Sequence, residues 1–496
     1  MLRPQAIARA VTALLSLTAL SACADRVTAP SSRLAAPAAR SFDAIAASGQ
    51  YIVLARGNAF PPNFANTVAA LGGSIHALHQ GAGIAVVRGL TASAAASLGA
   101  TSGIAEVDAD AVVALDAPVA AVAPTKADMV AVSAGSPSAA INPAKAALFS
   151  WQWNMRAIHA DQAWAAGKLG DPTVTVAILD TGIDYDAFDL NGLVDLSRST
   201  SFVTSDNAVR AKYFPGRNDI SDFNGHGTNV ATQVSSRAVA FAGVTARTTL
   251  IGVKVLDQSG SGSFGDILNG VLWAADHGAD VASMSIQGDF LKAGNGRLTA
   301  AINRVFDYAK SHGMLIVVAA GNSSENLDHN GNSTQIFCDA VHVVCVSSMG
   351  PATATGPVDV PSFFTNFGRS AISVAGPGGN ADAANGFTVS LWPWGPDFAS
   401  WVWSLCSKTV IAGFDASGAP QLTPCVAGDF LEGDIGTSQA TPHVAGLAAL
   451  LVAAKGHGQP QLIKQLIESS ADDVGAKGTD PFFGHGRINV AKAVGF

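Results

Sequence analysis

Two stretches of the 496-residue sequence consist almost entirely of aliphatic and β-branched residues, and they restrict the fold more than any other feature. They are Val174–Leu179 and Leu315–Ala320. Runs of this kind are typical of central strands in a parallel sheet that is covered on both faces. The sequence therefore predicts an α/β fold with a doubly wound, mainly parallel sheet.

A polar residue closes each of the two runs. Asp180 follows the first run directly, at the start of the segment Asp180–Asp184, and Asn322 follows the second after a single glycine. Sites in open α/β sheets form at the carboxyl ends of the strands. Asp180 is therefore expected to be a functional carboxylate. The evidence for Asn322 is weaker, because an Ala-Gly-Asn turn by itself is also common in ordinary loops.

A serine is placed at the start of a predicted helix in the stretch 436–446, which reads Gly-Thr-Ser-Gln-Ala-Thr-Pro-His-Val-Ala-Gly. Apolar residues continue from there at helical spacing, so Ser438 lies at the N-terminus of a buried helix. Unpaired amides and the positive end of the helix dipole stabilise negative charge at that point. Serines also cap helices for purely structural reasons, and this stretch alone leaves that alternative open.

A histidine lies between two glycines in the segment 224–231. The glycines allow the backbone to approach closely and leave the imidazole of His226 accessible. Because histidine titrates near neutral pH, it is well suited to move a proton.

Taken together and in this order, these segments resemble the motifs of the subtilisin-like serine proteases, D-T-G-I-D, G-H-G-T-H-V-A-G and G-T-S-x-A-T-P-H-V-A-G. The resemblance implies a serine endopeptidase with a triad of Asp180, His226 and Ser438. It also implies that the Asn322 amide donates to the oxyanion of the tetrahedral intermediate. No cofactor is implied for the chemistry, and Asp189 falls where some relatives bind a structural calcium ion.

Two positions of the histidine segment depart from the family pattern. Asn229 and Thr232 replace the second histidine and the last glycine of the histidine motif, and these changes concern local packing more than chemistry.

Two other classes of protein are the alternatives to a subtilisin-like protease. A catalytically silent peptide-binding lipoprotein with the same fold would be expected to have lost a motif residue. A serine-carboxyl peptidase would use a glutamate as its base, and His226 argues against that class.

The resemblance also implies two segments that pair with an extended peptide substrate. Pairing of this kind recognises the main chain more than the side chains, so broad specificity is expected. The residues concerned are Ser259, Gly260, Ser261, Gly262, Ser285, Ile286, Gln287 and Gly288.

The first 23 residues have the pattern of a bacterial export signal. Arg3 and Arg9 precede the apolar run Val11–Leu20, which is too short to span a bilayer permanently. The run ends in Leu-Ser-Ala-Cys, which resembles a lipobox and implies a lipid on Cys23. The alternative is an ordinary secretory signal in which this cysteine is incidental. We expect an exported protein that meets the membrane only through a lipid anchor.

The rest of the chain divides by composition. Residues 24–50 form an Ala-, Ser- and Pro-rich tether. Residues 51–115 alternate strand-like and helical patterns and resemble the small α+β prosegment of subtilisin-like proteases, which implies an intramolecular inhibitor. Residues 116–150 form the linker that is cut on maturation, and 151–496 form the peptidase domain. Within that domain, residues 381–433 form a Trp-rich insertion.

Four cysteines lie in the C-terminal half of the chain: Cys338, Cys345, Cys406 and Cys425. Export permits oxidation, and four cysteines allow three connectivities. Short spacing favours the pairs Cys338–Cys345 and Cys406–Cys425, with buried free thiols as the alternative. A zinc site is disfavoured because no Cys-x-x-Cys pair is present.

The charge balance limits the partners. Lys and Arg number 29 against 37 Asp and Glu, a formal net charge of −8, which argues against nucleic-acid binding. Polypeptide substrates and the chain's own prosegment are the expected partners.

Overall fold

The computed structural model describes residues 49–115, 142–292, 296–351, 356–380, 400–422 and 431–495. The predicted export signal with Cys23, most of the tether and most of the linker lie outside these residues. So do residues 381–399 and 423–430 of the predicted Trp-rich insertion, which include Cys425.

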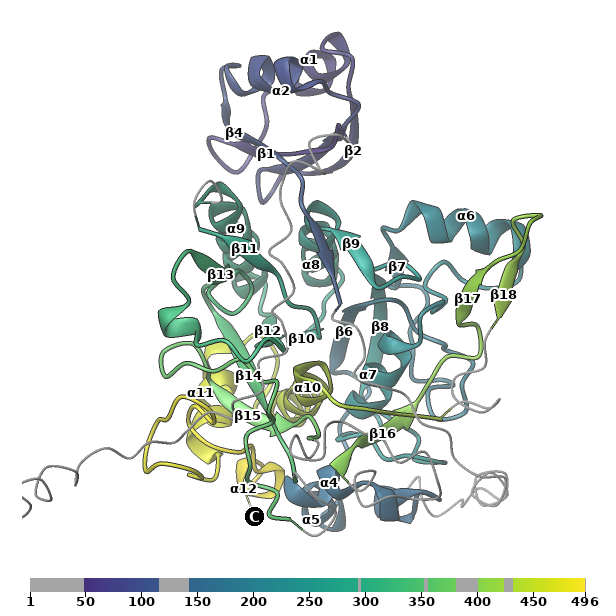
Figure 1. Ribbon diagram of the computed structural model, residues 1–496, viewed down its shortest axis with the longest axis vertical. Coiled ribbons are helices and arrows are strands. Elements are labelled where there is room, and N and C mark those ends of the chain that lie inside the picture. Colours follow the sequence, from purple (N-terminus) through teal and green to yellow (C-terminus); the bar gives the residue numbers. More distant parts are fainter. Residues whose placement is uncertain are drawn as a thin grey trace, which may run out of the picture. The chain divides into compact units, whose positions relative to one another are not determined.

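A seven-stranded sheet forms the centre of the peptidase part, in the order β15-β14-β12-β10-β6-β8-β7 (Figure 1). All neighbouring strands run parallel. Every residue of β6 and β12 is buried, as the apolar runs predict, so the expected parallel sheet is confirmed. The strands are β6 (Thr175–Asp180), β7 (Thr200–Ser201), β8 (Thr249–Lys254), β10 (Val281–Met284), β12 (Leu315–Ala319), β14 (Val343–Met349) and β15 (Val374–Pro377).

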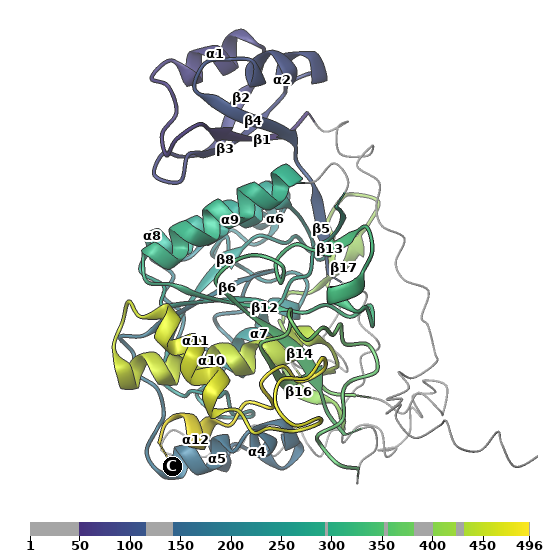
Figure 2. The same ribbon diagram turned by 90° about the vertical axis from the view of Figure 1, so that its left-hand side faces the viewer.

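Helices cover both faces of this sheet. Successive side chains of a strand point to opposite faces, and Ala177 and Leu179 of β6 join one hydrophobic core while Val176 and Ile178 join another. The first core includes α8 (Phe264–Asp276) and α9 (Gly296–Ser311); the second includes α5 (Ala160–Ala165), α7 (His226–Val234), α10 (Thr437–Lys455) and α11 (Pro460–Ser470) (Figure 2). The doubly wound arrangement thus follows from the two-sided burial of the strands. The remaining helices are α4 (Trp153–Ala157), α6 (Thr204–Tyr213) and α12 (Val490–Ala493).

The N-terminal region, residues 49–115, has a core of its own. An antiparallel sheet in the order β2-β3-β1-β4 packs with two short helices. The elements are β1 (Tyr51–Ala55), α1 (Phe64–Ala70), β2 (Ser74–His79), β3 (Ile84–Arg88), α2 (Ala92–Gly99) and β4 (Ile104–Ala109). Strand β2 has no counterpart in the sequence pattern, because its side chains are only partly buried and include two histidines.

Short strand pairs complete the described structure. They are β5 (Val112–Ala114) with β9 (Ser261–Ser263), β11 (Asp289–Leu291) with β13 (Ser333–Gln335), β16 (Val402–Leu405) with β19 (Leu431–Asp434), and β17 (Ile411–Phe414) with β18 (Pro420–Leu422). Trp401 and Trp403, from the predicted insertion, are buried in a hydrophobic cluster with Leu405 and Leu431. These two tryptophans therefore contribute to packing.

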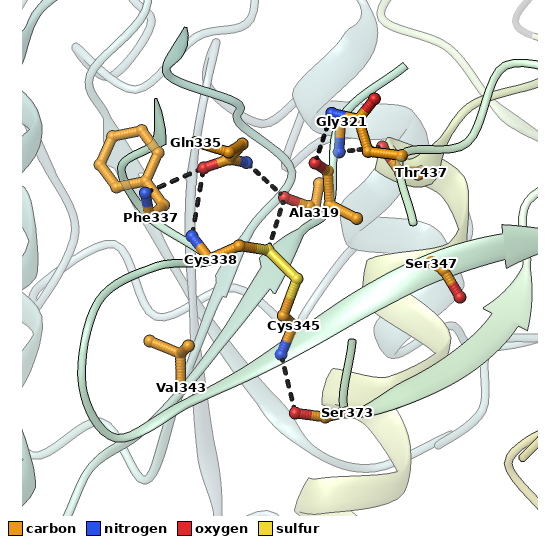
Figure 3. Close-up of a disulfide and its surroundings, with 12 residues drawn as sticks. Ala319, Gly321, Gln335, Phe337, Cys338, Val343, Cys345, Ser347, Ser373 and Thr437 are labelled. Atoms are coloured by element: carbon orange, nitrogen blue, oxygen red, sulfur yellow. Dashed lines mark hydrogen bonds between the residues drawn. A yellow bond between two sulfur atoms is a disulfide. The ribbon is translucent and has the colours of Figure 1, made fainter. Parts of the chain in front are cut away.

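A disulfide joins Cys338 to Cys345, as their short spacing predicts (Figure 3). Gln335 ties this loop to the end of β12, since its amide donates to the Ala319 carbonyl and its oxygen accepts from the amide of Cys338. Cys406 is also disulfide-bonded. Because Cys425 lies outside the described residues, its pairing with Cys406 stays a prediction.

None of the helices in the described ranges is both long enough and apolar enough to cross a membrane.

Candidate active site

The carboxylate at the end of β6 meets the imidazole at the start of α7. His226 Nδ1 lies 2.8 Å from Oδ1 of Asp180, and that oxygen also accepts from the amide of Thr181. A carboxylate can only accept, so Nδ1 of His226 is the donor. Nε2 is therefore the nitrogen available for proton transfer.

Asp222 holds the loop that precedes His226, a role that the sequence motifs do not indicate. One carboxylate oxygen accepts from the amides of Asn224 and Gly225 and from the Thr181 hydroxyl, and the other accepts from the amide and hydroxyl of Thr228. Gly225 has a φ of 110°, a backbone conformation that favours glycine. This network connects the end of β6 to the first turn of α7. The Asp-x-Asn-Gly order before His226 was the available signal.

Three carboxylates act on the imidazole. Burial opposes the imidazolium, but Asp180, Asp434 and Glu432 outweigh it and raise the pKa of His226 to about 9. Burial raises the pKa of Glu432 to about 8, and burial also raises that of Asp434 to about 6 although the charge of His226 opposes it. Nothing in the sequence pattern pointed to these two acids, which lie on β19.

The proposed nucleophile is the second residue of α10 and is half-buried. The Ser438 hydroxyl donates to the Ser285 carbonyl at 3.1 Å, and the Ser285 hydroxyl donates to the Ser438 carbonyl at 2.8 Å. Within the described residues, no hydrogen bond joins Ser438 Oγ to His226. Catalytic hydrogen bonds commonly tighten only when substrate is bound.

Two N–H donors border one space beside Ser438. Asn322 Oδ1 accepts from the amide and hydroxyl of Thr437, at 2.8 and 2.9 Å, which assigns the other side-chain atom, Nδ2, as a donor. A Cβ added to Gly436 would lie 3.6 Å from Asn322 Nδ2 and 3.6 Å from the Ser438 amide nitrogen. Any side chain at Gly436 would therefore crowd the space between these donors.

The model of the subtilase family matches residues 171–486, which is more than half of the chain. The chain belongs to the subtilase family. It is 30% identical to thermitase from Thermoactinomyces vulgaris over 348 residues, which cover 70% of this chain and 96% of that protein. It is also 30% identical to the thermophilic serine proteinase of Bacillus sp. (strain AK1), over 69% of this chain and 67% of that protein.

Solved structures show the same fold. The epidermin leader peptide processing serine protease of Staphylococcus aureus aligns with a TM-score of 0.67 and 20% identity, covering 90% of this chain and 98% of that chain. Fervidolysin of Fervidobacterium pennivorans aligns with a TM-score of 0.64 and 20% identity, over 92% of this chain and 62% of that chain. This subtilase is thus a subtilisin-like serine endopeptidase, of a family whose reaction requires no cofactor.

The first segment expected to bind substrate is occupied by the subtilase's own N-terminal region. Strand β5 pairs antiparallel with β9, with Val113 opposite Gly262, and the amide of Leu115 donates to the Gly260 carbonyl at 2.8 Å. Ser259 lies in the turn before this edge. An extended segment of the chain itself therefore pairs with this edge, and the binding of a substrate there stays a prediction.

The second segment lies against the proposed nucleophile and the oxyanion donor. Ser285 contacts Ser438 as described, and Gln287 Oε1 accepts from the amide of Asn322. Ile286 is fully buried, and the Gly288 carbonyl accepts from the amide of Ile336. These contacts support the site and leave only part of the segment's backbone available to a substrate.

Asp189 does not fit the calcium site that the resemblance implied. It is fully buried, and its two carboxylate oxygens accept from the backbone amides of Val239, Ala240 and Phe241. Burial raises its pKa to about 7. Because N–H donors occupy the positions where a calcium ion would lie, Asp189 acts as an anchor for this loop. Among the described residues, no cluster of three or more His, Cys, Asp or Glu side chains could hold a metal ion.

Proposed function

We propose that this subtilase cleaves peptide bonds with Asp180, His226 and Ser438 as its triad and Asn322 as an oxyanion donor. The observation that carries the proposal is the 2.8 Å contact of His226 Nδ1 with Asp180, which leaves Nε2 for proton transfer. The donors of Asn322 and Ser438 beside Gly436 support it.

In the proposed reaction, neutral His226 takes the hydroxyl proton of Ser438 as the oxygen attacks the scissile carbonyl. The former carbonyl oxygen, which is now negatively charged, accepts hydrogen bonds from Asn322 Nδ2 and the Ser438 amide. His226 then gives its proton to the leaving amine, and water hydrolyses the acyl ester by the same route. Asp180 holds the imidazole and stabilises its cation.

A fluorophosphonate probe followed by peptide mass mapping tests this assignment. The processed protein should carry the adduct on Ser438, and Ser438→Ala should carry none. A processed protein that stays unlabelled at Ser438 would favour a silent peptide-binding lipoprotein instead.

We also propose that residues 51–115 are an inhibitory prosegment, linked by residues 116–150 to a peptidase domain of residues 151–496. The pairing of β5 with β9 supports this proposal, because it covers an edge that a substrate would need. Two further contacts hold the region in place. Oδ1 of Asp110 accepts from the amide of Gly265 at the start of α8, and Arg304 of α9 donates to the Ala55 carbonyl.

Export through residues 1–23 and a lipid on Cys23 complete the proposal, with residues 24–50 as the tether. The support is the sequence pattern alone. Cys23→Ser should move the protein from the membrane fraction to the soluble fraction after export. Unchanged membrane retention of that variant would remove the lipid from the proposal.

A further inference from the structure

Two carboxyl groups lie beside His226 without a role in the proposed reaction. Glu432 and Asp434 are two residues apart on β19, so their side chains leave the same face of the strand. Oε2 of Glu432 lies 3.6 Å from the point where a Cβ on Gly225, the residue before His226, would stand. Both acids are close enough to act through their charge on the imidazole of His226.

Gln439 adds a third oxygen acceptor at this place. It directly follows Ser438, is 1% exposed, and donates through Nε2 to Oδ2 of Asp434 at 2.9 Å. Its Oε1 has no hydrogen-bond partner among the described residues. A Cβ added to Gly436 would lie 2.8 Å from this oxygen. The same Cβ would lie 3.6 Å from each of the two oxyanion donors. A buried acceptor thus borders the space where the scissile bond would be bound, and leaving it without a donor is costly.

The surroundings supply almost no positive charge to these acceptors. The Asp434 carboxylate accepts from the amide of Ile435 and from Gln439, while the Glu432 carboxylate accepts from no described residue. The other charged groups near this cluster, Asp180 on β6 and Asp222 before α7, are carboxylates as well. The buried amine of Lys254 on β8 is already held by Asp206 and the Thr181 carbonyl. The cluster therefore gathers three side-chain oxygen acceptors, and His226 is the only cationic group beside them among the described residues.

The path of a bound peptide determines which of its residues meets the cluster. Residues 112–115 run along β9, beside α8, and the proposed function places a substrate's acyl side on that edge. In Figure 1, β16, the partner of β19, lies on the other side of α7 from β9. A chain that runs along β9 and continues past Ser438 would next reach Glu432, Asp434 and Gln439. The cluster thus lies on the leaving-group side of the scissile bond.

We propose that Glu432, Asp434 and Gln439 form a subsite for a basic side chain, lysine or arginine, on the residue that directly follows the scissile bond. The proposal rests on the proposed peptidase function. An ammonium has three N–H donors and a guanidinium has five, enough to meet both carboxylates and Gln439 Oε1. Hydrogen bonds between oppositely charged groups are stronger than those between neutral groups, so a partly buried subsite of this kind would favour a cation.

Occupation of this subsite would also affect the base. A cation between the two carboxylates opposes their attraction for the His226 proton, so the pKa of His226 falls from about 9 towards neutrality. Neutral His226 is the form that accepts the Ser438 proton. Recognition of the basic residue and activation of the base are therefore coupled.

The test uses the mature protein obtained from the full-length chain, with four quenched fluorescent peptides that differ only in the residue after the scissile bond. That residue is arginine, lysine, norleucine or glutamate. We expect kcat/KM for the two basic peptides to exceed that for norleucine by about tenfold, the size of one hydrogen bond to a charged group. The glutamate peptide should be the poorest substrate.

Variants then locate the effect. Glu432→Gln and Asp434→Asn should each lower the ratio of kcat/KM for arginine over norleucine, whereas Glu468→Gln, on helix α11, should leave the ratio unchanged. In the unmodified protein, the acidic limb of the kcat profile should lie at lower pH for the arginine peptide than for the norleucine peptide. A purely structural role of the two acids would not produce that difference.

Equal kcat/KM values for arginine and norleucine, or an unchanged ratio in both variants, would overturn the subsite. Failure of the proposed function looks different, because no peptide would be cut and Ser438 would take no fluorophosphonate label.

Discussion

Acid should destabilise this protein through one buried histidine on α10. His443 is fully buried; its Nδ1 donates to the Gln439 carbonyl at 2.7 Å, and its Nε2 accepts from the Asn154 amide group at 2.8 Å. This pair of contacts suits only the neutral ring. Burial disfavours the imidazolium and lowers the pKa of His443 from its ordinary 6.5 to about 4.

The size and sign of this change in the free energy of unfolding follow from the linkage between protonation and folding. Because the unfolded chain binds a proton near pH 6.5 and the folded chain only near pH 4, protons favour unfolding between these values. Above pH 7 His443 contributes nothing. At about 1.36 kcal/mol per pH unit, the free energy of unfolding should have fallen by about 3 kcal/mol at pH 4.

Guanidinium chloride unfolding of the Ser438→Ala protein, which should not digest itself, measures this effect. Other groups titrate in the same range, so the comparison is with Ser438→Ala/His443→Gln, whose glutamine can still donate to the Gln439 carbonyl. Between pH 7.5 and pH 4 the parent should lose about 3 kcal/mol more than the double variant. Parallel pH dependences in the two proteins would refute the reasoning.

Three further predictions concern maturation, the disulfide and metal dependence. Ser438→Ala should accumulate as unprocessed precursor. Asn322→Ala should mature slowly, because removal of one oxyanion donor lowers turnover roughly a hundredfold to a thousandfold. Clean cutting of Ser438→Ala without other proteases would show that maturation is not autocatalytic. Replacing Cys338 and Cys345 by serine should lower the free energy of unfolding by about 2.4 kcal/mol, the chain-entropy value for a separation of seven residues, as measured by denaturant unfolding against the parent. Adding a calcium chelator should not release the loop that Asp189 anchors, so hydrogen exchange at the amides facing that carboxylate should be unchanged, and faster exchange would show that a metal ion holds the loop.

Local sequence patterns were sufficient for the elements that are buried on two sides. The runs that became β6 and β12 are apolar throughout because helices cover both faces of the sheet, and their ends position Asp180 and Asn322. Strand β2 gave no such signal, since its side chains are partly exposed. The motif order also indicated the family, because four short segments with their spacing rarely coincide by chance.

The sequence alone thus determined the sheet class and the residues with a recognisable backbone context, because burial on a regular element leaves a periodic pattern. Only the tertiary structure brought Glu432 to His226, about two hundred positions away, and turned the backbone amides of residues 239–241 towards Asp189. These approaches depend on how loops close and how β19 pairs with β16, and no local pattern records them. The character of the site around the imidazole, including the acidic groups gathered there, was therefore decided by folding.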